Sequence, residues 1–452
     1  MKLSKERAIS ATVLLTLGFL ATSLLADPPS SPAPGEKPAT SPASGDPFVK
    51  KDAPAPDETG PVSNLILTFE KYQLSQTEGA KLIQESEADQ DRYDRVRDLV
   101  KTGHAWLKTL LCVAARPGQQ GLAEQVDILR YAINFQVIPG KGVYASDYKQ
   151  RNLGDRVVFK ISASPDQQSC NAIIFMESTR LKGFVNQSLH YDTVPFVAAH
   201  PDFTTQRVNN GPAYFTYGKI RFLGTYSPVP LISLPPQAPG VKPGDSEMTL
   251  VFGRASQLQL TPVVMKDGKP SRLECEISLY SMDRSQAREI LVRKQEPDSA
   301  YQDVQALVKA GQAKLEHMAI LRTDNGIKSN LDEMAEITYP TGSNGGTETQ
   351  DVGFSQELKP DLIGESSLLT IDLTKSQLLN DTGRLQMTGI SMPYNESQPL
   401  FELQSLATQI NSGLGEHELV GTISPAEDTG VNDQLNTGRV WLEFIRTTAV
   451  NP

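Results

Sequence analysis

The histidines are the residues of this chain best suited to catalysis or metal binding, and their spacing argues against both roles. None belongs to a metal-ligand pattern such as H-E-x-x-H, and no cysteine lies near enough in sequence to complete a zinc site. The five are His104, His190, His200, His317 and His417. We expect them on the surface or on strand faces, without a ligating or catalytic role.

The remaining chemical candidates are equally weak. Three cysteines cannot all pair, so no disulfide framework is predicted, although one bridge would suit an oxidising compartment. The chain contains no G-x-S-x-G, G-x-G-x-x-G or Walker A motif. Acidic pairs such as Asp91 with Asp94, and Asp332 with Glu333, fit a solvated face better than paired carboxylate catalysis. We therefore predict no catalytic, cofactor-binding or metal-binding residue, no cofactor and no enzymatic activity.

Length and charge narrow the classes of partner. The chain has 452 residues, 38% hydrophobic and 21% charged, which is ample for a hydrophobic core and two or three domains. Its net charge is −10. An acidic surface repels nucleic acid and anionic lipid head groups, and we see no basic patch with interleaved aromatic residues. Nucleic acid is therefore excluded as a partner, while membrane association stays open because of the N-terminus.

The first 26 residues are typical of an export signal. Lys2, Lys5 and Arg7 precede the apolar run 9–20, and the segment 21–26 supplies small residues for cleavage, which is expected after Ala26 or Ser23. The alternative is an uncleaved anchor, because the wider apolar stretch from Ala8 to Ala26 is close to the ~20 residues that span a bilayer. Residues 27–61 are rich in Pro, Ala and Ser and are predicted to be a disordered spacer. We expect export to the periplasm or outer membrane of a Gram-negative-type bacterium.

An internal repeat organises the rest of the chain. With an offset of 208 residues, Tyr72 falls on Tyr280, the segment 93–103 falls on 301–311, and Tyr131 falls on Tyr339 without a gap. Later segments match at slightly smaller offsets, including 218–228 with 415–425. A repeat this long indicates a duplicated domain. We assign repeat 1 to residues 62–262 and repeat 2 to residues 263–452.

The repeat also assigns roles to single residues. His317 falls opposite Thr109 and His417 opposite Ile220, so neither histidine has a counterpart in repeat 1. Cys112 falls opposite Ile320 and Cys275 opposite Leu67, which predicts small apolar strand positions for both cysteines. Cys170 is expected in a turn at residues 168–171.

Each repeat is predicted to be a helical pair on a mainly antiparallel sheet, an α+β arrangement. A short strand (65–69, and 273–279 in repeat 2) leads to a helix with capping-box residues at Ser75–Glu78 and Asp283–Gln286. A second helix over 90–101 ends near Gly103, or Gly311 in repeat 2. A β-hairpin should follow, turning at residues 116–118 and 324–326. Short strands at 156–161, 172–175, 218–223 and 249–254 complete repeat 1, with a long Pro-rich loop over 228–243.

The second half of each repeat resembles the C-terminal homology domain of bacterial secretins, the outer-membrane pores of type II and type III secretion and of type IV pili. The matching segments are Arg151–Gly154 with Val157–Ile161, then Pro201–Val208, Gly218–Gly224 and the last strands Leu250–Arg254 and Leu442–Arg446. The resemblance covers about two-fifths of the chain. A secretin carries one such domain behind several ring domains, whereas this chain carries two and no recognisable ring domain.

Our leading expectation is a non-enzymatic envelope protein, a duplicated secretin-like module that assembles with itself, with other envelope proteins, or with a secretion or pilus apparatus. Open sheet edges could serve that role by strand addition. The alternative is a soluble periplasmic module that binds a peptide or glycan. A hydrolase with an unrecognised site is the third hypothesis.

Overall fold

The structure is a computed structural model that describes residues 63–450, with gaps at 139–141, 192–193, 227–246, 261–271, 294–295, 297, 341–345, 364–365, 381–398, 427–428 and 430–437. The expected signal peptide, the spacer and the Pro-rich loop over 228–243 lie outside the described residues. No helix in the described part is long and apolar enough to cross a bilayer.

The first half of the described chain, residues 63–259, contains two helices and eight strands. Their bounds are β1 (Ser63–Ser75), α1 (Gln76–Glu85), α2 (Asp89–Lys101), β2 (Ala105–Ala115), β3 (Gln120–Ile138), β4 (Gly142–Ala163), β5 (Ser169–Tyr191), β6 (Val194–Thr216), β7 (Ile220–Tyr226) and β8 (Glu247–Gln259).

The second half, residues 272–450, has the same order of elements. It contains β9 (Arg272–Asp283), α3 (Arg284–Val292), α4 (Ser299–Lys309), β10 (Ala313–Asp324), β11 (Ser329–Pro340), β12 (Thr347–Ile363), β13 (Ser366–Asn380), β14 (Leu400–Ser412), β15 (His417–Ile423) and β16 (Arg439–Val450).

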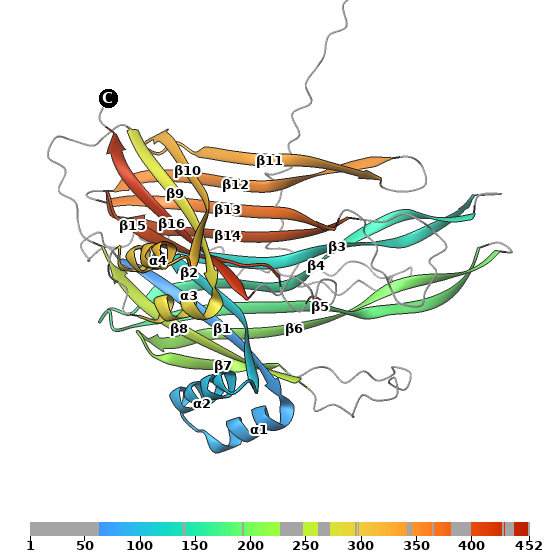
Figure 1. Ribbon diagram of the computed structural model, residues 1–452, viewed down its shortest axis with the longest axis horizontal. Coiled ribbons are helices and arrows are strands. Elements are labelled where there is room, and N and C mark those ends of the chain that lie inside the picture. The colour runs from blue at the N-terminus through green and yellow to red at the C-terminus, as the bar shows by residue number, and fades with distance from the viewer. Residues whose placement is uncertain are drawn as a thin grey trace, which may run out of the picture. The chain divides into compact units, whose positions relative to one another are not determined.

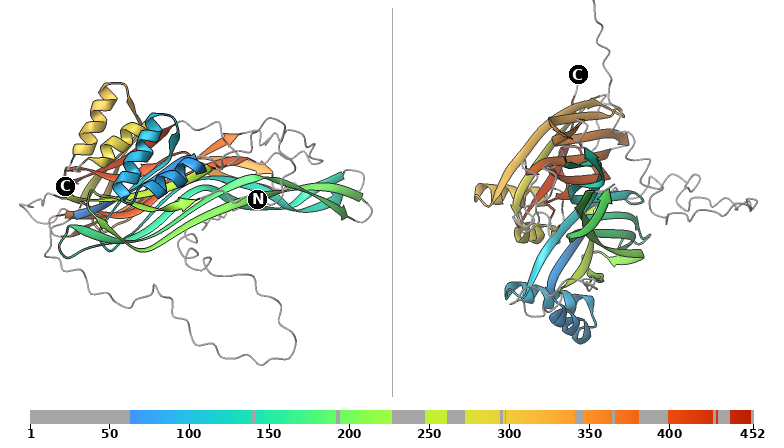
Figure 2. Two further views of the ribbon diagram at one scale, coloured as in Figure 1. Left: turned by 90° about the horizontal axis from the view of Figure 1, so that it is seen from below. Right: turned by 90° about the vertical axis from the view of Figure 1, so that its right-hand side faces the viewer.

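The strands form two eight-stranded antiparallel sheets (Figure 1). Sheet A has the order β10-β9-β16-β15-β2-β1-β8-β7, and sheet B has the order β11-β12-β13-β14-β3-β4-β5-β6. Each half contributes four neighbouring strands to each sheet, and the two sets of four follow one another in the same order. The class is thus mostly β, with four short helices in the described part. All four pack on strands of sheet A and lie together on one side of the molecule (Figure 2).

Both halves repeat the same irregularities at matching positions. The register of β1 against β2 shifts between Lys71 and Tyr72, and that of β9 against β10 shifts between the corresponding Leu279 and Tyr280. Gly154 and Gly353 have φ values of 135° and 142°, and a Cβ there would lie 2.2 and 2.1 Å from a carbonyl oxygen of the neighbouring strand. Only glycine tolerates such a conformation at so close an approach. The two halves therefore obey the same local backbone constraints.

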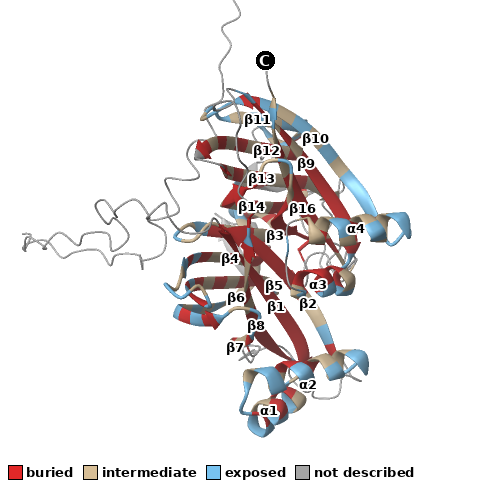
Figure 3. Cartoon of the chain, turned by 90° about the vertical axis from the view of Figure 1, so that its left-hand side faces the viewer, coloured by how far each residue is buried: buried red, intermediate tan, exposed pale blue. Residues whose placement is uncertain are grey.

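Apolar side chains from both sheets form the main core. Leu67, Val113 and Ile277 of sheet A and Phe159 and Leu373 of sheet B are almost fully buried in it. This follows from period-two alternation, which places every second side chain of a strand on the inner face. A second cluster under α1 and α2 includes Tyr72, Tyr93, Val96 and Phe252. Figure 3 shows that burial is greatest along the middle strands of both sheets.

The helix starts agree with the sequence analysis. Ser75 caps α1, its side chain accepting from the Glu78 amide 3.1 Å away, and Glu78 reaches back to the Ser75 hydroxyl at 3.4 Å. Asp283 caps α3, although it accepts from Ser285 and not from the amide one residue further along. α2 ends at Lys101, two residues before Gly103, whose φ is 76°.

The predicted hairpins at residues 116–118 and 324–326 are wrong. Strands β2 and β3 are not paired but belong to different sheets, as do β10 and β11. The Gly118 amide donates to the Ile161 carbonyl of β4, and the Gly326 amide donates to the Pro360 carbonyl of β12. Both acceptors belong to sheet B, so at each turn the chain passes from sheet A into sheet B. The turns were predicted at the correct residues, but they connect one sheet to the other and not two strands of one hairpin.

Two further expectations need correction. The strands predicted at 156–161 and 172–175 are parts of β4 and β5, which have 22 and 23 residues. Cys170 does not lie in a turn but is a fully buried residue of β5. Polar residues on the outer faces of these long strands hid their continuity, because an exposed strand face needs no apolar side chains.

Candidate functional site

The two halves meet at an internal junction that crosses both sheets. In sheet A, β15 of the second half pairs with β2 of the first, with Gly421 opposite Val113. A Cβ on Gly421 would lie 2.5 Å from the Cys112 carbonyl oxygen, so this contact requires glycine. The Thr422 hydroxyl accepts from the Cys112 amide at 2.8 Å. The side chain of Thr422 thus replaces part of the strand ladder.

In sheet B the junction is a longer ladder. Residues 401–407 of β14 pair with residues 128–122 of β3. Beyond the ladder, the Thr408 hydroxyl donates to the Ala114 carbonyl at 2.5 Å, and the Arg116 amide donates to the Gln409 carbonyl at 2.6 Å. The junction therefore consists of a backbone ladder in sheet B and of a short pairing supplemented by threonine side chains in sheet A, and the two halves share both sheets.

A buried ion pair ties helix α3 of the second half to strand β1 of the first. The Arg288 Nε donates to Glu70 Oε2 at 2.9 Å, and the side chains are 5% and 1% exposed. Arg288 also donates to the Tyr93 hydroxyl and lies over the Tyr93 ring, with its Cζ 5.3 Å from the centroid. Tyr93 donates in turn to Glu70 Oε1 at 2.8 Å, and Tyr72 also donates to Glu70.

The electrostatics of this cluster favour the charged pair. Burial alone would lower the pKa of Arg288, but the Glu70 carboxylate, with Tyr72 and Tyr93, outweighs it and holds that pKa above its usual value. Burial, followed by the Glu70 charge, raises the pKa of both tyrosines, which keeps their hydroxyls protonated. Arg288 thus stays charged beside the Glu70 carboxyl group. Removing one partner would leave a buried charge without compensation.

Two further contacts extend the helix side of the junction. The Arg284 Nη1 donates to the Leu107 carbonyl of β2 at 2.7 Å. Arg97 of α2 and Glu289 of α3 form a more exposed ion pair with 3.1 Å between nitrogen and oxygen. One face of α3 therefore supplies Arg284, Arg288 and Glu289 to the first half.

The sheet B part of the junction carries two carboxylates. Asp127 of β3 lies directly opposite Glu402 of β14, and both are 1% exposed. The Thr429 hydroxyl donates to Asp127 Oδ2 at 2.5 Å, and the Gln404 amide donates to Glu402 Oε1 at 2.8 Å. Burial, with a further contribution from Glu402, raises the pKa of Asp127 to about 7. This part of the junction is therefore sensitive to pH near neutrality.

Two edges of the sheets have no partner strand among the described residues. We call β10 with β11 the head edge and β7 with β6 the tail edge. At the internal junction, the strands that correspond to these edges are covered: β2 and β3 for the head edge, β15 and β14 for the tail edge. The chain therefore presents both sides of its own junction a second time, uncovered, at opposite ends of the sheets (Figure 1).

The head edge exposes apolar side chains. Leu315, Met318 and Ile320 of β10 are 40%, 51% and 54% exposed. Leu110 and Cys112, which correspond to Met318 and Ile320, are 1% and 0% exposed under the internal junction. Figure 3 shows β10 pale blue along much of its length. A flat apolar edge strand is a pairing surface, and one that native proteins normally cover or charge.

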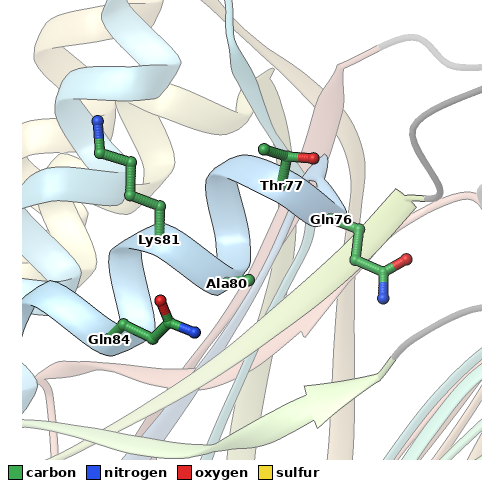
Figure 4. Close-up of a pocket in the computed structure, with 5 residues that line it drawn as sticks. All are labelled: Gln76, Thr77, Ala80, Lys81 and Gln84. Carbon is green, nitrogen blue, oxygen red and sulfur yellow. The ribbon is translucent and has the colours of Figure 1, made fainter.

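The tail edge includes an unoccupied face of helix α1. A shallow hollow runs along this face, lined by Gln76, Thr77, Ala80, Lys81 and Gln84 (Figure 4). At the offset of 208 residues, Gln76, Ala80 and Lys81 correspond to Arg284, Arg288 and Glu289. The hollow is therefore the counterpart of the α3 face that packs at the internal junction. On β7, the exposed Thr225 corresponds to the buried Thr422.

The structure does not bring the candidate residues of the sequence analysis together into a site. His317 contacts Glu333 and stacks on Phe354, while His417 contacts Asp298 and stacks on Tyr301. The three cysteines are buried and free. Asp91, Asp94, Asp332 and Glu333 are exposed. In the described part, no group of three or more His, Cys, Asp or Glu side chains is placed to hold a metal ion.

Sequence reasoning missed Glu70 and Arg288, which are 218 residues apart. A signal was present in the self-alignment, because both positions change together: Ser278 replaces Glu70 and Ala80 replaces Arg288. A paired loss of opposite charges points to two residues in contact.

Comparisons with known proteins give only distant likenesses. No protein-family model matches the chain, and no curated protein matches it significantly by sequence. Among solved structures, the type II secretin GspD of enteropathogenic Escherichia coli aligns at 12% identity and a TM-score of 0.24, over 41% of this chain and 71% of that one. The Salmonella secretin InvG aligns at 8% identity and a TM-score of 0.25, over 62% and 88%. The Vibrio cholerae competence-pilus secretin PilQ aligns at 11% identity and a TM-score of 0.21, over 86% of this chain and 61% of that one. At these scores, no property of those proteins carries over to this chain.

Proposed function

We propose that this protein is a non-enzymatic, exported assembly protein of the cell envelope, built from two copies of one module that joins further copies head to tail. The observation that carries the proposal is the recurrence of the internal junction. Both of its sides appear again, unpaired within the described chain, as the head edge and the tail edge. A contact between unlike edges can repeat indefinitely, closing into a ring or growing as a filament.

The correspondence extends to single contacts. Suppose that the tail edge of one copy meets the head edge of another as β15 and β14 meet β2 and β3. The Thr225 hydroxyl then accepts from the Ile320 amide of the other copy, as the Thr422 hydroxyl accepts from the Cys112 amide within the chain. The exposed Met318 and Ile320 are buried in that arrangement, as Leu110 and Cys112 are now, and Leu315 becomes partly buried like Leu107. Burial of apolar area supplies the main driving force for such an association.

The export signal and the short secretin-like segments support a place in the envelope, and we suggest assembly with a secretion or pilus apparatus as the setting. The non-enzymatic part of the proposal is supported by the residues placed above: His317 and His417 each contact a single carboxylate, and the two acidic pairs are exposed.

The test is the assembly state of the full-length protein extracted in mild detergent. Light scattering during size exclusion and negative-stain imaging should show assemblies whose mass is a multiple of the chain mass and rises with concentration. A replacement of Ile320 by Lys should abolish assembly, because a charge on an edge strand blocks pairing. Monomers at all concentrations would refute the proposal.

The alternative occupant of the head edge is an extended peptide, which could add to β10 or β11 as an extra strand. This is the periplasmic binding-module hypothesis. A monomer whose melting temperature rises with added peptide would favour it.

A further inference from the structure

The internal junction and the two open edges differ in charge in a coordinated way. At the internal junction Arg288 meets Glu70, and both are buried. The tail edge has Ala80 at the position of Arg288, and the head edge has Ser278 at the position of Glu70. Both members of the ion pair are therefore absent from the open edges, and neither Ala80 nor Ser278 introduces a charge that would lack its partner.

The surroundings of Glu70 are otherwise retained at Ser278. Glu70 accepts hydrogen bonds from Tyr72 and Tyr93, and the corresponding residues are Tyr280 and Tyr301. Those two tyrosines lie against each other, with their ring centroids 6.0 Å apart. The position could therefore hold a carboxylate, but it holds a serine that is 1% exposed. The difference lies in the charge and not in the shape of the site.

Other charged contacts of the junction follow the same pattern. Arg97 and Glu289 are replaced by Gln305 and Lys81, which leaves one charge and no pair. The buried carboxylates Asp127 and Glu402 are replaced at the open edges by Ala335 and Thr204. Three separate contacts have thus changed on both sides.

We infer that the Glu70–Arg288 ion pair, which we call the key, determines which edges can pair. Internal junctions and junctions between copies then alternate strictly along the assembly, and the tail edge of one copy accepts only the head edge of another. This inference rests on the proposed head-to-tail assembly and adds its specificity. A tail edge that displaced α3 from the first half would bury Glu70 opposite Ala80, without an arginine. A second half that docked on a foreign head edge would bury Arg288 opposite Ser278. The first mistake leaves Glu70 buried without its arginine, and the second leaves Arg288 with only the exposed Glu289 of its own helix as a counter-charge, whereas the two correct junctions have neither mismatch.

Charge complementarity in sheet B supports a second copy of this chain as the partner. Applying the register of β14 against β3 to β6 and β11 places Arg207 opposite Asp332 of the next copy. Within the chain the corresponding residues are Ser405 and Glu124, which form no ion pair. The contact between copies therefore gains an attractive pair where the internal junction has none.

Cysteine crosslinking of full-length chains tests the inference. Lys81→Cys marks the tail edge and Gln305→Cys the head edge, because their counterparts Glu289 and Arg97 approach within 3.1 Å. The native cysteines are buried, and burial raises the pKa of Cys112 and Cys170 to about 12, so they should not react. A mixture of the two variants, treated with a short bismaleimide, should give a crosslinked dimer. A mixture of Lys81→Cys with Arg97→Cys, which reports the wrong pairing, should not.

The key itself is tested by introducing the same ion pair at the open edges. Ser278→Glu added to the Gln305→Cys chain, or Ala80→Arg added to the Lys81→Cys chain, should each weaken crosslinking roughly a hundredfold in the concentration required. Combining the two should restore it, because the open edges then carry the internal ion pair. Circular dichroism and the melting temperature establish that each chain is folded, and Ala80→Arg, on a half-exposed helix face, keeps the test open if Ser278→Glu fails to fold.

The outcomes separate the two claims. No dimer from the unmodified Lys81→Cys and Gln305→Cys mixture would remove the proposed head-to-tail assembly. A dimer that is indifferent to Ser278→Glu and Ala80→Arg, or that is not rescued by combining them, would leave assembly intact and overturn the key. Crosslinking between Lys81→Cys and Arg97→Cys would overturn the alternation.

Discussion

Strands β2 and β10 occupy the same place in the two halves but have different environments. Leu110 and Cys112 on β2 are covered by the second half, whereas Met318 and Ile320 on β10 are about half exposed. Both strands carry apolar residues at these two positions. A strand that faced water throughout the life of the protein would be expected to carry charged residues at these positions. The comparison indicates that β10 is built to be covered.

The tail edge gives the same result with a hydrogen-bonding residue. Thr422 binds the backbone of β2, and the corresponding Thr225 is retained although β7 has a described neighbour, β8, on one side only. Polar and apolar positions thus agree, while the charged positions differ. What distinguishes the internal junction from the open edges is therefore the charge of the corresponding side chains and not their shape.

The largest expected effect comes from breaking the covered junction at its ion pair. Arg288→Ala should lower the free energy of unfolding by about 3–5 kcal/mol, because Glu70 then remains buried without a counter-charge. Guanidinium denaturation followed by circular dichroism measures this.

The matched control copies the open edges into the junction. Arg288→Ala combined with Glu70→Ser reproduces Ala80 and Ser278, removes both charges, and should recover most of the lost stability. If the double variant were as unstable as Arg288→Ala alone, the loss would come from packing and the comparison of the two junctions would fail.

Truncating one side chain on each strand sharpens the comparison of β2 with β10. Leu110→Ala should cost about 2–5 kcal/mol, as expected for a cavity in a core. The corresponding Met318→Ala should change the stability of the monomer by less than about 0.5 kcal/mol, because that side chain faces solvent. Denaturation at a dilution where only monomer is present separates the two, and equal losses would mean that β10 is already covered within the chain.

The fold was predictable where its signals are local. The serine cap at Ser75, the helix end near Gly103 and the matching positions of the two halves all depend on neighbouring residues or on direct self-comparison. The corner after β2 was not predictable in this way, because a turn at Gly118 looks the same whether the next strand pairs back or enters another sheet. That choice depends on strand β4, some 40 residues further along.

The junction depends on contacts that no local pattern reports. Pairing of β15 with β2 and of β14 with β3 joins residues roughly 280 to 310 positions apart. The predicted α+β modules did not anticipate that both halves would share both sheets. The joint replacement of Glu70 and Arg288 was a sequence signal of that contact. Reading it required asking which residues differ between the copies, and not only which agree.

The pH dependence of the covered junction is the next smaller effect. Burial raises the pKa of Asp127 from its ordinary 3.8 to about 7. The folded state therefore binds a proton that the unfolded state has released, and this contribution to stability is full below pH 4 and is lost as the pH rises to about 7. Asp127 faces Glu402 and the Thr429 hydroxyl, and Lys375 is close enough to Glu402 to interact with it.

Asp127→Asn should flatten that part of the stability profile, by about 4 kcal/mol between pH 4 and pH 8. Glu418 and Glu443, whose pKa burial raises to about 8, add losses of the same sign in both proteins, so the difference between wild type and variant isolates Asp127. The exposed Asp332→Asn serves as the control and should leave the slope unchanged. An unaltered slope in Asp127→Asn would place the pH dependence elsewhere.

The smallest expected effect concerns the pair that only the open junction has. Arg207 of β6 is exposed and bound to Glu177 at 2.7 Å within the chain, and Asp332 of β11 is exposed at the other end of sheet B. Because a cross-strand charge pair contributes roughly 0.2–1 kcal/mol, Arg207→Asp should weaken assembly about twofold to fivefold and barely affect the monomer.

Adding Asp332→Arg to the same chain restores opposite charges in every contact between copies and should recover assembly, as measured by sedimentation velocity. Recovery with Asp332→Arg, but not with Glu177→Arg, would assign the effect to the contact between copies. Recovery with Glu177→Arg alone would show that β6 and β11 do not meet in this register.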